Sequence, residues 1–188
     1  IPVIVLSDQH LNDSYFTVDR LDFQDIVIDR GHILSDQDLP SPHEYNRYAA
    51  SESGISPRIL PGLTKAVLYA DSDEHTAAGH ITESATIRNQ MMRKRMQKME
   101  GLQREIGPPE IYPSVQAKFA LLGWGSTYGV IKEAVDRLNE NGILAQMIHY
   151  SEIFPFNRRH VTAEQLSKVR IIAIENNYTG QFANFFSM

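Results

Sequence analysis

A glycine-rich segment offers the clearest chemical possibility in this sequence. Residues 123–129 read GWGSTYG and separate an apolar run, which predicts a strand, from a segment with helical periodicity. Backbone N–H groups and the positive end of a helix dipole can hold an anion at such a turn. No acidic residue ends the next predicted strand, so the segment does not complete a dinucleotide fingerprint. It predicts either an anion-binding turn or a purely structural one.

A second polar segment, ENNYTGQ at residues 175–181, follows the last predicted strand. The carboxyl ends of parallel strands share one edge of a sheet, where open α/β proteins usually build their sites. We therefore expect the polar side chains of this segment to lie beside the glycine-rich turn. The alternative is that its Asn and Gly residues only form a turn, while Glu175 caps a helix or pairs locally.

An acidic and histidine-rich cluster precedes the longest predicted helix and contains Asp71, Asp73, Glu74, His75 and His80. Carboxylates and imidazoles are suitable ligands for a divalent metal. The two histidines are five residues apart, however, so on a helix they would diverge, and the spacing matches no helical zinc motif. We therefore expect no metal site here.

Residues 82–106 predict one long helix, because apolar residues recur at spacings of three and four. One face is rich in Met, and the other is basic, with Arg88, Arg93, Lys94, Arg95, Lys98 and Arg104. Such a helix can receive an acidic partner or a phosphate. Alternatively, the basic face is only solvated and the Met face is ordinary packing.

The composition excludes several classes of protein. With no Cys, the chain can hold no disulfide, thiolate-ligated zinc or iron–sulfur cluster, so any cluster belongs to a partner. The net charge of −5 argues against nucleic-acid binding, and the longest apolar runs are too short to cross a membrane. No nucleophile motif such as GxSxG is present. We expect no nucleic-acid partner, no membrane partner and no self-contained hydrolase.

The periodicity also divides the chain into regions. Residues 1–6 predict a buried parallel strand ending in a functional or capping turn at Ser7-Asp8. Residues 21–64 lose periodicity and collect prolines and glycines, which is typical of an interdomain connector.

After a strand at 66–70 and the long helix, strands at 118–122, 143–150 and 170–175 alternate with helices at 130–138 and 163–169. This alternation predicts a parallel α/β unit. Gly142 would end the first of these helices, and Thr162 with Gln165 would cap the second.

Several segments, in order, resemble the C-terminal half of the alpha subunit of 2-oxoacid:ferredoxin oxidoreductases, of the 2-oxoglutarate type. They are PVIVLSD at 2–8, PRILPG at 57–62, DEHTAAG at 73–79, RNQMMRKRMQK at 88–98, GSTYGVIKEAV at 125–135 and ENNYTGQ at 175–181. The DEH segment and the basic helix point to the 2-oxoglutarate branch. Each motif is weak alone, but together they span essentially the whole chain.

This resemblance implies an α/β fold with two domains. Residues 1–20 would end a thiamine-pyrimidine-binding domain, and residues 21–64 would form an interdomain linker. Residues 65–188 would form a transketolase C-terminal-like parallel α/β sandwich, including the long basic helix at about 82–106.

The resemblance also implies an activity for the whole enzyme. Family members, expected in the cytoplasm, oxidatively decarboxylate a 2-oxoacid such as 2-oxoglutarate on thiamine diphosphate with Mg. They pass electrons through an iron–sulfur cluster on a partner subunit to ferredoxin, and they use coenzyme A as co-substrate, here to form succinyl-CoA. The family's Tyr-Pro-Ile-Thr-Pro motif, thiamine-activating acidic residue and Arg-Gly-Gly-Pro-Ser-Thr-Gly segment are not found in this sequence. We therefore expect no catalytic residue here and no activity without the beta subunit, which would hold the diphosphate and Mg.

Position within the family pattern suggests which residues make contacts. Those expected to contact coenzyme A or a subunit interface are Gly125, Ser126, Thr127, Asn176, Asn177, Gly180 and Gln181. Those expected at an interdomain or intersubunit interface are Asp73, Glu74, His75, Arg93 and Arg95. Two other functions remain open: a noncatalytic phosphate- or nucleotide-binding module built on residues 123–129, and a docking module whose basic helix binds an acidic partner such as ferredoxin.

Overall fold

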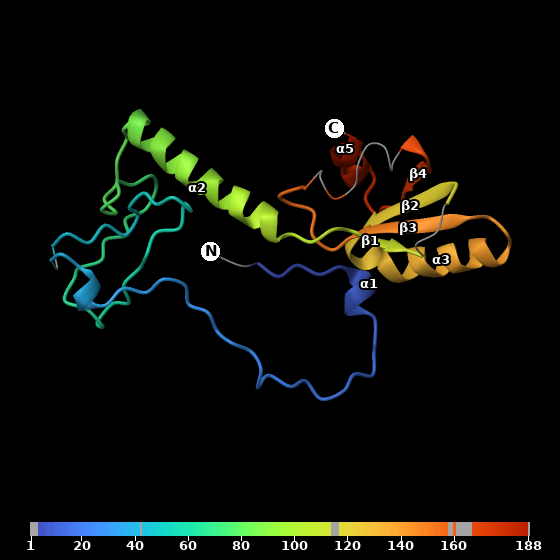
Figure 1. Cartoon of the computed structure of the whole chain (residues 1–188), viewed down its shortest axis with the longest axis horizontal. Helices are drawn as coiled ribbons and strands as arrows, with labels where there is room; N and C mark the ends of the chain where they lie inside the picture. Colours follow the sequence, from blue (N-terminus) through green and yellow to red (C-terminus); the bar gives the residue numbers. More distant parts are fainter. Residues whose placement is uncertain (1–3, 42, 114–116, 158–159, 161–166, 188) are drawn as a thin grey trace. The chain divides into compact units, whose positions relative to one another are not determined.

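The computed structural model describes residues 4–41, 43–113, 117–157, 160 and 167–187 (Figure 1). The chain divides into two compact units. The first contains Ile1–Asp19 and Gln103–Met188, and the second is Arg20–Leu102. In the part of the chain that is described, no helix combines the length and the apolar character needed to cross a bilayer.

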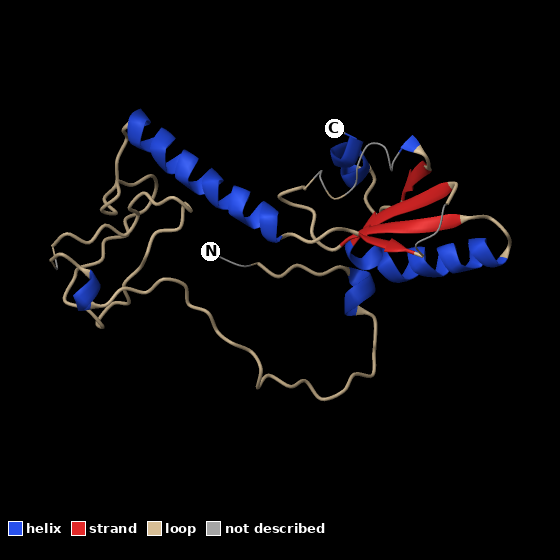
Figure 2. Ribbon diagram, in the orientation of Figure 1, coloured by secondary structure: helices blue, strands red, loops and turns tan. Residues whose placement is uncertain are grey.

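A four-stranded sheet is the centre of the first unit (Figure 2). Its strands are β1 (Glu110–Tyr112), β2 (Phe119–Trp124), β3 (Ala145–Tyr150) and β4 (Arg170–Ala173), in the order β1-β3-β2-β4. β2 pairs in parallel with β3 and with β4, which confirms the predicted α/β class. β1 pairs antiparallel with β3 and has no counterpart in the predicted pattern, because three residues are too few to show periodicity.

Helix α3 (Tyr128–Glu140) covers one face of this sheet and confirms the predicted helix at 130–138. Its buried Ile131 and Val135 form one apolar cluster with Leu121 of β2 and Met147 of β3. The two helix residues are four apart and therefore lie on the same face. The helix ends as expected, since Gly142 has a φ of 77°, a left-handed conformation that glycine adopts without strain.

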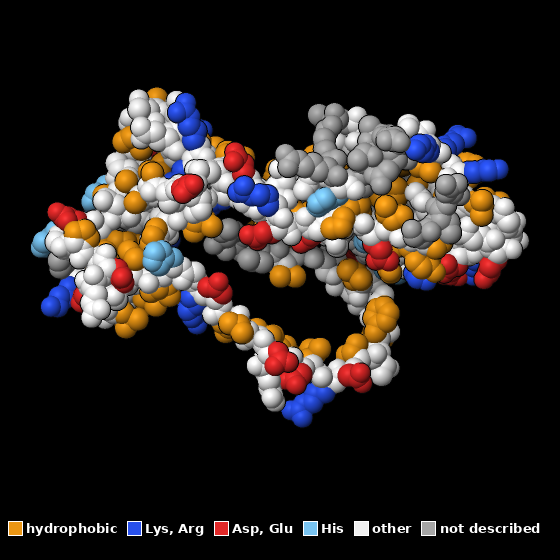
Figure 3. Space-filling view, in the orientation of Figure 1, with side chains coloured by type: hydrophobic (Ala, Val, Ile, Leu, Met, Phe, Trp, Pro, Cys, Tyr) orange, Lys and Arg blue, Asp and Glu red, His pale blue; other side chains and the backbone are white. Residues whose placement is uncertain are grey.

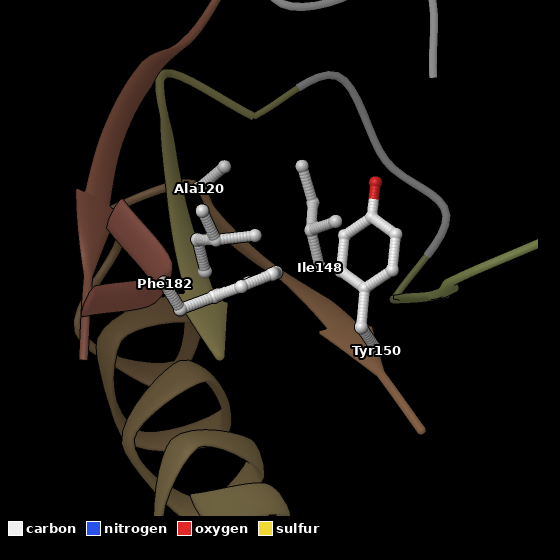
Figure 4. Packing of buried hydrophobic residues seen from close by; sticks show 5 residues of the cluster. Ala120, Ile148, Tyr150 and Phe182 are labelled. Carbon is white, nitrogen blue, oxygen red and sulfur yellow. The ribbon is translucent and has the colours of Figure 1, made fainter. Parts of the chain in front are cut away.

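Helix α5 (Gln181–Ser187) packs on the opposite face. Its buried Phe182 lies against Ala120, Ile148 and Tyr150, whose side chains come from β2 and β3 (Figure 4). Leu122 completes the cluster, and partly buried hydrophobic side chains, three of them Phe, pack against it. Because successive strand residues point to opposite faces, Leu121 faces α3 whereas Ala120 and Leu122 face α5.

The amino-terminal segment departs from the prediction of a buried strand. Residues 4–6 are exposed and form no strand, because no neighbouring strand among the described residues pairs with them. The turn at Ser7-Asp8 does act as a cap: Asp8 is the N-cap of the short helix α1 (Gln9–Asn12). Hydrophobic side chains are also exposed between α1 and the 3₁₀ helix η1 (Asp36–Asp38), including Phe16, Leu21 and Phe23 (Figure 3).

Helix α2 (Ala85–Glu105) confirms the predicted long helix and organises the second unit. The Lys94 ammonium donates to the Tyr48 carbonyl oxygen at 2.8 Å and to the Ser56 hydroxyl, and the Gln97 amide donates to the Glu52 carbonyl oxygen. These donors hold an otherwise irregular chain against the helix.

The segment predicted as a linker, residues 21–64, makes internal contacts of its own. Tyr45 and Ile59 are buried, and the Tyr45 hydroxyl accepts the Ile59 N–H at 3.2 Å. The Leu34 N–H donates to the Arg58 carbonyl, and the Arg58 N–H donates to the His32 carbonyl. The assignment of this segment as an interdomain linker, with its domain boundaries, stays a prediction.

Two further predicted elements have different outcomes. The strand predicted at 66–70 is wrong, because these residues lie in a bend and irregular backbone and pair with no strand in the described part of the chain. The helix predicted at 163–169, with its cap of Thr162 and Gln165, falls mainly on residues 161–166, which lie outside the described residues.

We expect Ile148→Ala to lower the free energy of unfolding of the first unit by about 2–5 kcal/mol, because it opens a cavity between β3 and α5. Denaturant titration followed by the fluorescence of Trp124, the single Trp of the chain, measures this change. The exposed Ile26→Ala is the matched control and should shift stability by less than about 0.5 kcal/mol. Equal effects of the two substitutions would contradict the described core.

Candidate functional site

The glycine-rich segment forms a tight turn between β2 and α3. β2 ends at Trp124, the 3₁₀ turn η2 (Gly125–Thr127) follows, and α3 begins at Tyr128. The buried Thr127 hydroxyl donates to the Trp124 carbonyl at 2.7 Å and accepts the Trp124 N–H at 3.1 Å. Gly125 has a φ of 55°, so the turn depends on a residue that tolerates the left-handed region.

Gly123 permits the close approach of α3 to this turn. A Cβ at position 123 would lie 2.2 Å from Ile131 Cδ1 and 2.7 Å from Thr127 Oγ1. Both distances are far below van der Waals contact, so a side chain at this position would displace the Ile131 and Thr127 side chains. The glycine therefore sets the position of the turn relative to the sheet.

His149, near the end of β3, supports the turn from beneath. Its Nε2 lies 3.0 Å from the Gly125 carbonyl oxygen, and the Tyr128 ring meets its imidazole edge to face at 5.1 Å. Since a carbonyl oxygen only accepts, Nε2 carries the proton in this contact. The sequence shows that a histidine stands near the end of this strand, but it does not show the contact, because the partner lies 24 residues away.

Asp8 joins the amino-terminal segment to the same turn. The Ser126 hydroxyl donates to one oxygen of the Asp8 carboxylate, and the Leu11 N–H donates to the other at 2.9 Å. These hydrogen bonds, that of Ser126 first, lower the pKa of Asp8 below its ordinary value. The contact spans 118 residues of sequence, so no local pattern indicates it.

The ENNYTGQ segment caps α5. The Glu175 carboxylate accepts the N–H groups of Phe182 at 2.9 Å and Ala183 at 2.8 Å, and Asn177 accepts the N–H of Gln181 at 2.9 Å. This confirms the local capping interpretation for Glu175. Burial raises the pKa of Glu175, but the hydrogen bonds from Phe182, Ala183, Asn177 and Trp124 outweigh it, so the pKa lies below its ordinary value.

The two polar segments and the amino-terminal segment line an open cavity of about 490 Å³. Its lining is apolar at Leu6, Leu11 and Trp124 and polar at Ser7, Asp8, Gly125, Ser126, Thr127, Asn176 and Asn177. Most residues predicted at this edge thus lie together. Gly180 and Gln181 do not line the cavity; the Gln181 N–H supports Asn177 instead.

The charge of the cavity limits the groups it can bind. The described lining contains no Lys or Arg, and its single ionisable side chain is the Asp8 carboxylate. A phosphate here would meet only backbone and neutral side-chain donors and would lie near a negative charge. The positive end of α5 is already paired with the Glu175 carboxylate. The cavity is therefore better suited to neutral, hydrogen-bonding groups with apolar parts.

The predicted interface residues lie in the second unit, around α2. Arg95 pairs with Glu74, at 3.2 Å between Nη1 and Oε2, and this contact lowers the pKa of Glu74 below its usual value. His75 stacks on Tyr48 with a ring separation of 3.6 Å. Asp73 is in a loop with a φ of 60°, and Arg93 is exposed. Among the described residues, no group of three or more His, Asp or Glu side chains is arranged to hold a metal ion.

The comparisons with known proteins agree with the fold. No known protein-family model matches the chain. The 2-oxoacid:ferredoxin oxidoreductase 1 alpha subunit of Sulfurisphaera tokodaii is 34% identical over 186 residues, which is 96% of this chain and 28% of that protein. The alpha subunit of Saccharolobus solfataricus shows the same identity and the same shares. By sequence, the chain is homologous to the alpha subunits of 2-oxoacid:ferredoxin oxidoreductases.

The homology to alpha subunits extends to the structure and confirms the resemblance seen in the sequence. A 2-oxoglutarate:ferredoxin oxidoreductase from Magnetococcus marinus, solved with 2-oxoglutarate, coenzyme A and succinyl-CoA bound, matches with a TM-score of 0.76 and 26% identity. The match covers 90% of this chain and 29% of that chain. A transketolase C-terminal-like domain is consistent with the mixed sheet, whose β2 pairs in parallel with β3 and β4 and which α3 and α5 cover. The chain spans less than a third of the alpha subunits it matches.

We expect Gly123→Ala to destabilise the first unit by about 1–3 kcal/mol, because its methyl group would overlap Ile131 and Thr127. Denaturant titration measures the change. Gly129→Ala is the matched control, since nothing lies within 4 Å of a Cβ there, and alanine suits the first turn of α3. A stability of Gly123→Ala equal to that of the wild type would contradict the described packing of the turn.

The lowered pKa of Glu175 predicts a dependence of stability on pH. The carboxylate is favoured in the folded state, so its contribution is fully present above its ordinary pKa of 4.5 and is lost as pH falls through the lower folded value. Melting temperatures between pH 3 and 7 should show a smaller acid loss for Glu175→Gln than for the wild type. Glu100→Gln, at an exposed position on α2, should leave the profile unchanged.

Proposed function

We propose that the chain is the C-terminal part of the alpha subunit of a 2-oxoacid:ferredoxin oxidoreductase. Its whole enzyme would oxidatively decarboxylate 2-oxoglutarate, form succinyl-CoA from coenzyme A and pass electrons to ferredoxin, in the cytoplasm. The main support is 34% identity to named alpha subunits over 96% of the chain. Preference for 2-oxoglutarate is supported by the structural match to the Magnetococcus marinus enzyme alone.

The described residues do not fit the principal cofactors of such an enzyme. They form no cluster of carboxylates and imidazoles that would hold Mg, and the cavity has no cationic side chain for a diphosphate. The full sequence has no Cys to ligate an iron–sulfur cluster. These features support the proposal that thiamine diphosphate, Mg and the cluster are bound with the beta subunit and other parts of the enzyme.

The role proposed for this chain is structural, at a boundary between parts of the enzyme. The cavity combines apolar side chains with the neutral donors and acceptors Ser126, Asn176 and Asn177, a mixture typical of protein interfaces. Its lack of Lys and Arg and its Asp8 carboxylate disfavour the phosphates of coenzyme A. Of the two expectations for this edge, we therefore propose contact with another segment of the enzyme.

The noncatalytic alternatives have weaker support. A phosphate-binding module on residues 123–129 would need cationic side chains, and the described cavity lining contains no Lys or Arg. A docking module on α2 would need free basic side chains, but Arg95 is paired with Glu74 and the Lys94 ammonium donates to neutral groups. The docking module would therefore depend on the other basic side chains of α2, among them Arg88, Arg93 and Arg104.

Reconstitution of the complete alpha subunit with its beta subunit tests the proposed activity. We expect coenzyme A-dependent reduction of ferredoxin or a viologen dye with 2-oxoglutarate, stronger than with pyruvate, and none when thiamine diphosphate is withheld. Preference for pyruvate would leave the family assignment unchanged but would replace 2-oxoglutarate with pyruvate as the substrate. No reduction of either substrate by a cluster-loaded complex would refute the proposed activity.

The same complex distinguishes the two roles of the cavity. Asn176→Ala removes a lining side chain that is exposed in this chain. An interface role predicts weaker association within the enzyme at an unchanged KM for coenzyme A. A raised KM for coenzyme A with unchanged association would assign the cavity to the co-substrate instead.

A further inference from the structure

Lys94 is held in an unusual way for a surface lysine. Its Nζ donates to the Tyr48 carbonyl oxygen at 2.8 Å and to the Ser56 hydroxyl oxygen. The Ser56 hydroxyl itself donates to the Ala49 carbonyl at 2.8 Å, so toward Lys94 it acts as an acceptor. Among the described residues, no carboxylate forms an ion pair with Lys94. Both partners of the amine are therefore neutral acceptors.

The charged groups around Lys94 are mostly cations. Lys98 lies one turn further along α2. Arg47 Cζ lies 5.1 Å from the centroid of the Tyr48 ring, and Lys94 Nζ lies 5.8 Å from the same centroid. Arg95 is adjacent, but Glu74 balances its charge. His75 stacks on Tyr48 and adds no negative charge. Burial first, and then Lys98, Arg47 and Arg95, lower the pKa of Lys94 to about 8.

A neutral lysine in this position would be a nucleophile. A neutral amine has two N–H groups and one lone pair, and the Tyr48 and Ser56 oxygens match the two N–H groups. The lone pair is then left free for reaction. Near pH 7.5, roughly a quarter of such an amine is neutral, against about one in a thousand for a lysine with an ordinary pKa.

We propose that Lys94 is a site of acylation by coenzyme A thioesters. The amine nitrogen attacks the thioester carbonyl carbon, an N–C bond forms, the C–S bond breaks, and the thiolate leaves and takes up the proton released by the amine. The products are an amide on Lys94 and free coenzyme A. The presence of succinyl-CoA as the natural acyl donor rests on the proposed function, whereas the reactivity of Lys94 does not.

The surrounding cations favour this class of donor. Coenzyme A carries several phosphate groups, and Arg47 and Lys98 provide positive charge beside the amine to attract them.

Acylation would also change the structure, because an amide nitrogen keeps one N–H in place of two. It would therefore release one of the two hydrogen bonds that hold residues 48 and 56 against α2. Product accumulation would thus act on this part of the subunit.

Mass spectrometry of the complete alpha–beta complex incubated with separately prepared succinyl-CoA tests the proposal. We expect Lys94 to be modified at least about tenfold faster than Lys132, whose pKa is raised by hydrogen bonds to Tyr112 and Asp136. The rate at Lys94 should rise with pH and level off above about pH 8. Acetyl-CoA should modify the same site.

Two comparisons separate the parts of the argument. Arg47→Gln, with circular dichroism as the check of folding, should slow modification of Lys94 and leave that of Lys132 unchanged. A phosphate-free thioester with the same acyl group should react more slowly than succinyl-CoA, and salt should reduce the difference. Modification of Lys94 no faster than that of Lys132 would overturn the proposal. Because the thioester is supplied ready-made, that result would leave the proposed enzyme activity untouched.

Discussion

The alternation of side chains along β2 is the constraint on which the first unit depends. β2 lies between β3 and β4, so both of its edges are paired, and α5 and α3 cover its two faces. Ala120 and Leu122 contribute to the cluster under α5, while Leu121 contributes to the cluster under α3. A shift of one residue in register would exchange these faces and expose both clusters. The same strand leads directly into the glycine-rich turn, so its register also sets the position of the candidate site.

Among the described residues, the carboxylates at the carboxyl edge of the sheet are held by hydrogen bonds from neutral donors and not by ion pairs. Asp8 is satisfied by the Ser126 hydroxyl and a backbone N–H, and Glu175 by two N–H groups of α5 and an amide. Each carboxylate stabilises a helix start or a turn. The described lining of the cavity beside Asp8 contains no Lys or Arg, which supports the proposed protein contact over phosphate binding.

In the second unit, helix α2 is the regular element against which the irregular chain packs. Its long side chains, chiefly Lys94 and Gln97, hold that chain by donating hydrogen bonds to backbone carbonyl oxygens. Gly54 lies against the helix so closely that a Cβ would be 2.5 Å from the Lys94 carbonyl oxygen. This arrangement partly buries the Lys94 amine beside Lys98, Arg47 and Arg95, and burial first, and then these cations, lower its pKa.

The sequence by itself determined the α/β class, the long helix, α3 and its glycine end, and the family, because periodicity and short motifs are local properties. The sequence also predicted that the two polar segments lie at one edge of the sheet, because the carboxyl ends of parallel strands lie at the same edge. Only the tertiary structure decided that Asp8 reaches Ser126 and that His149 supports Gly125. It also decided that residues 4–6 and 66–70 pair with no strand among the described residues. Those outcomes depend on contacts between distant residues and on paired backbones, which a single sequence does not record.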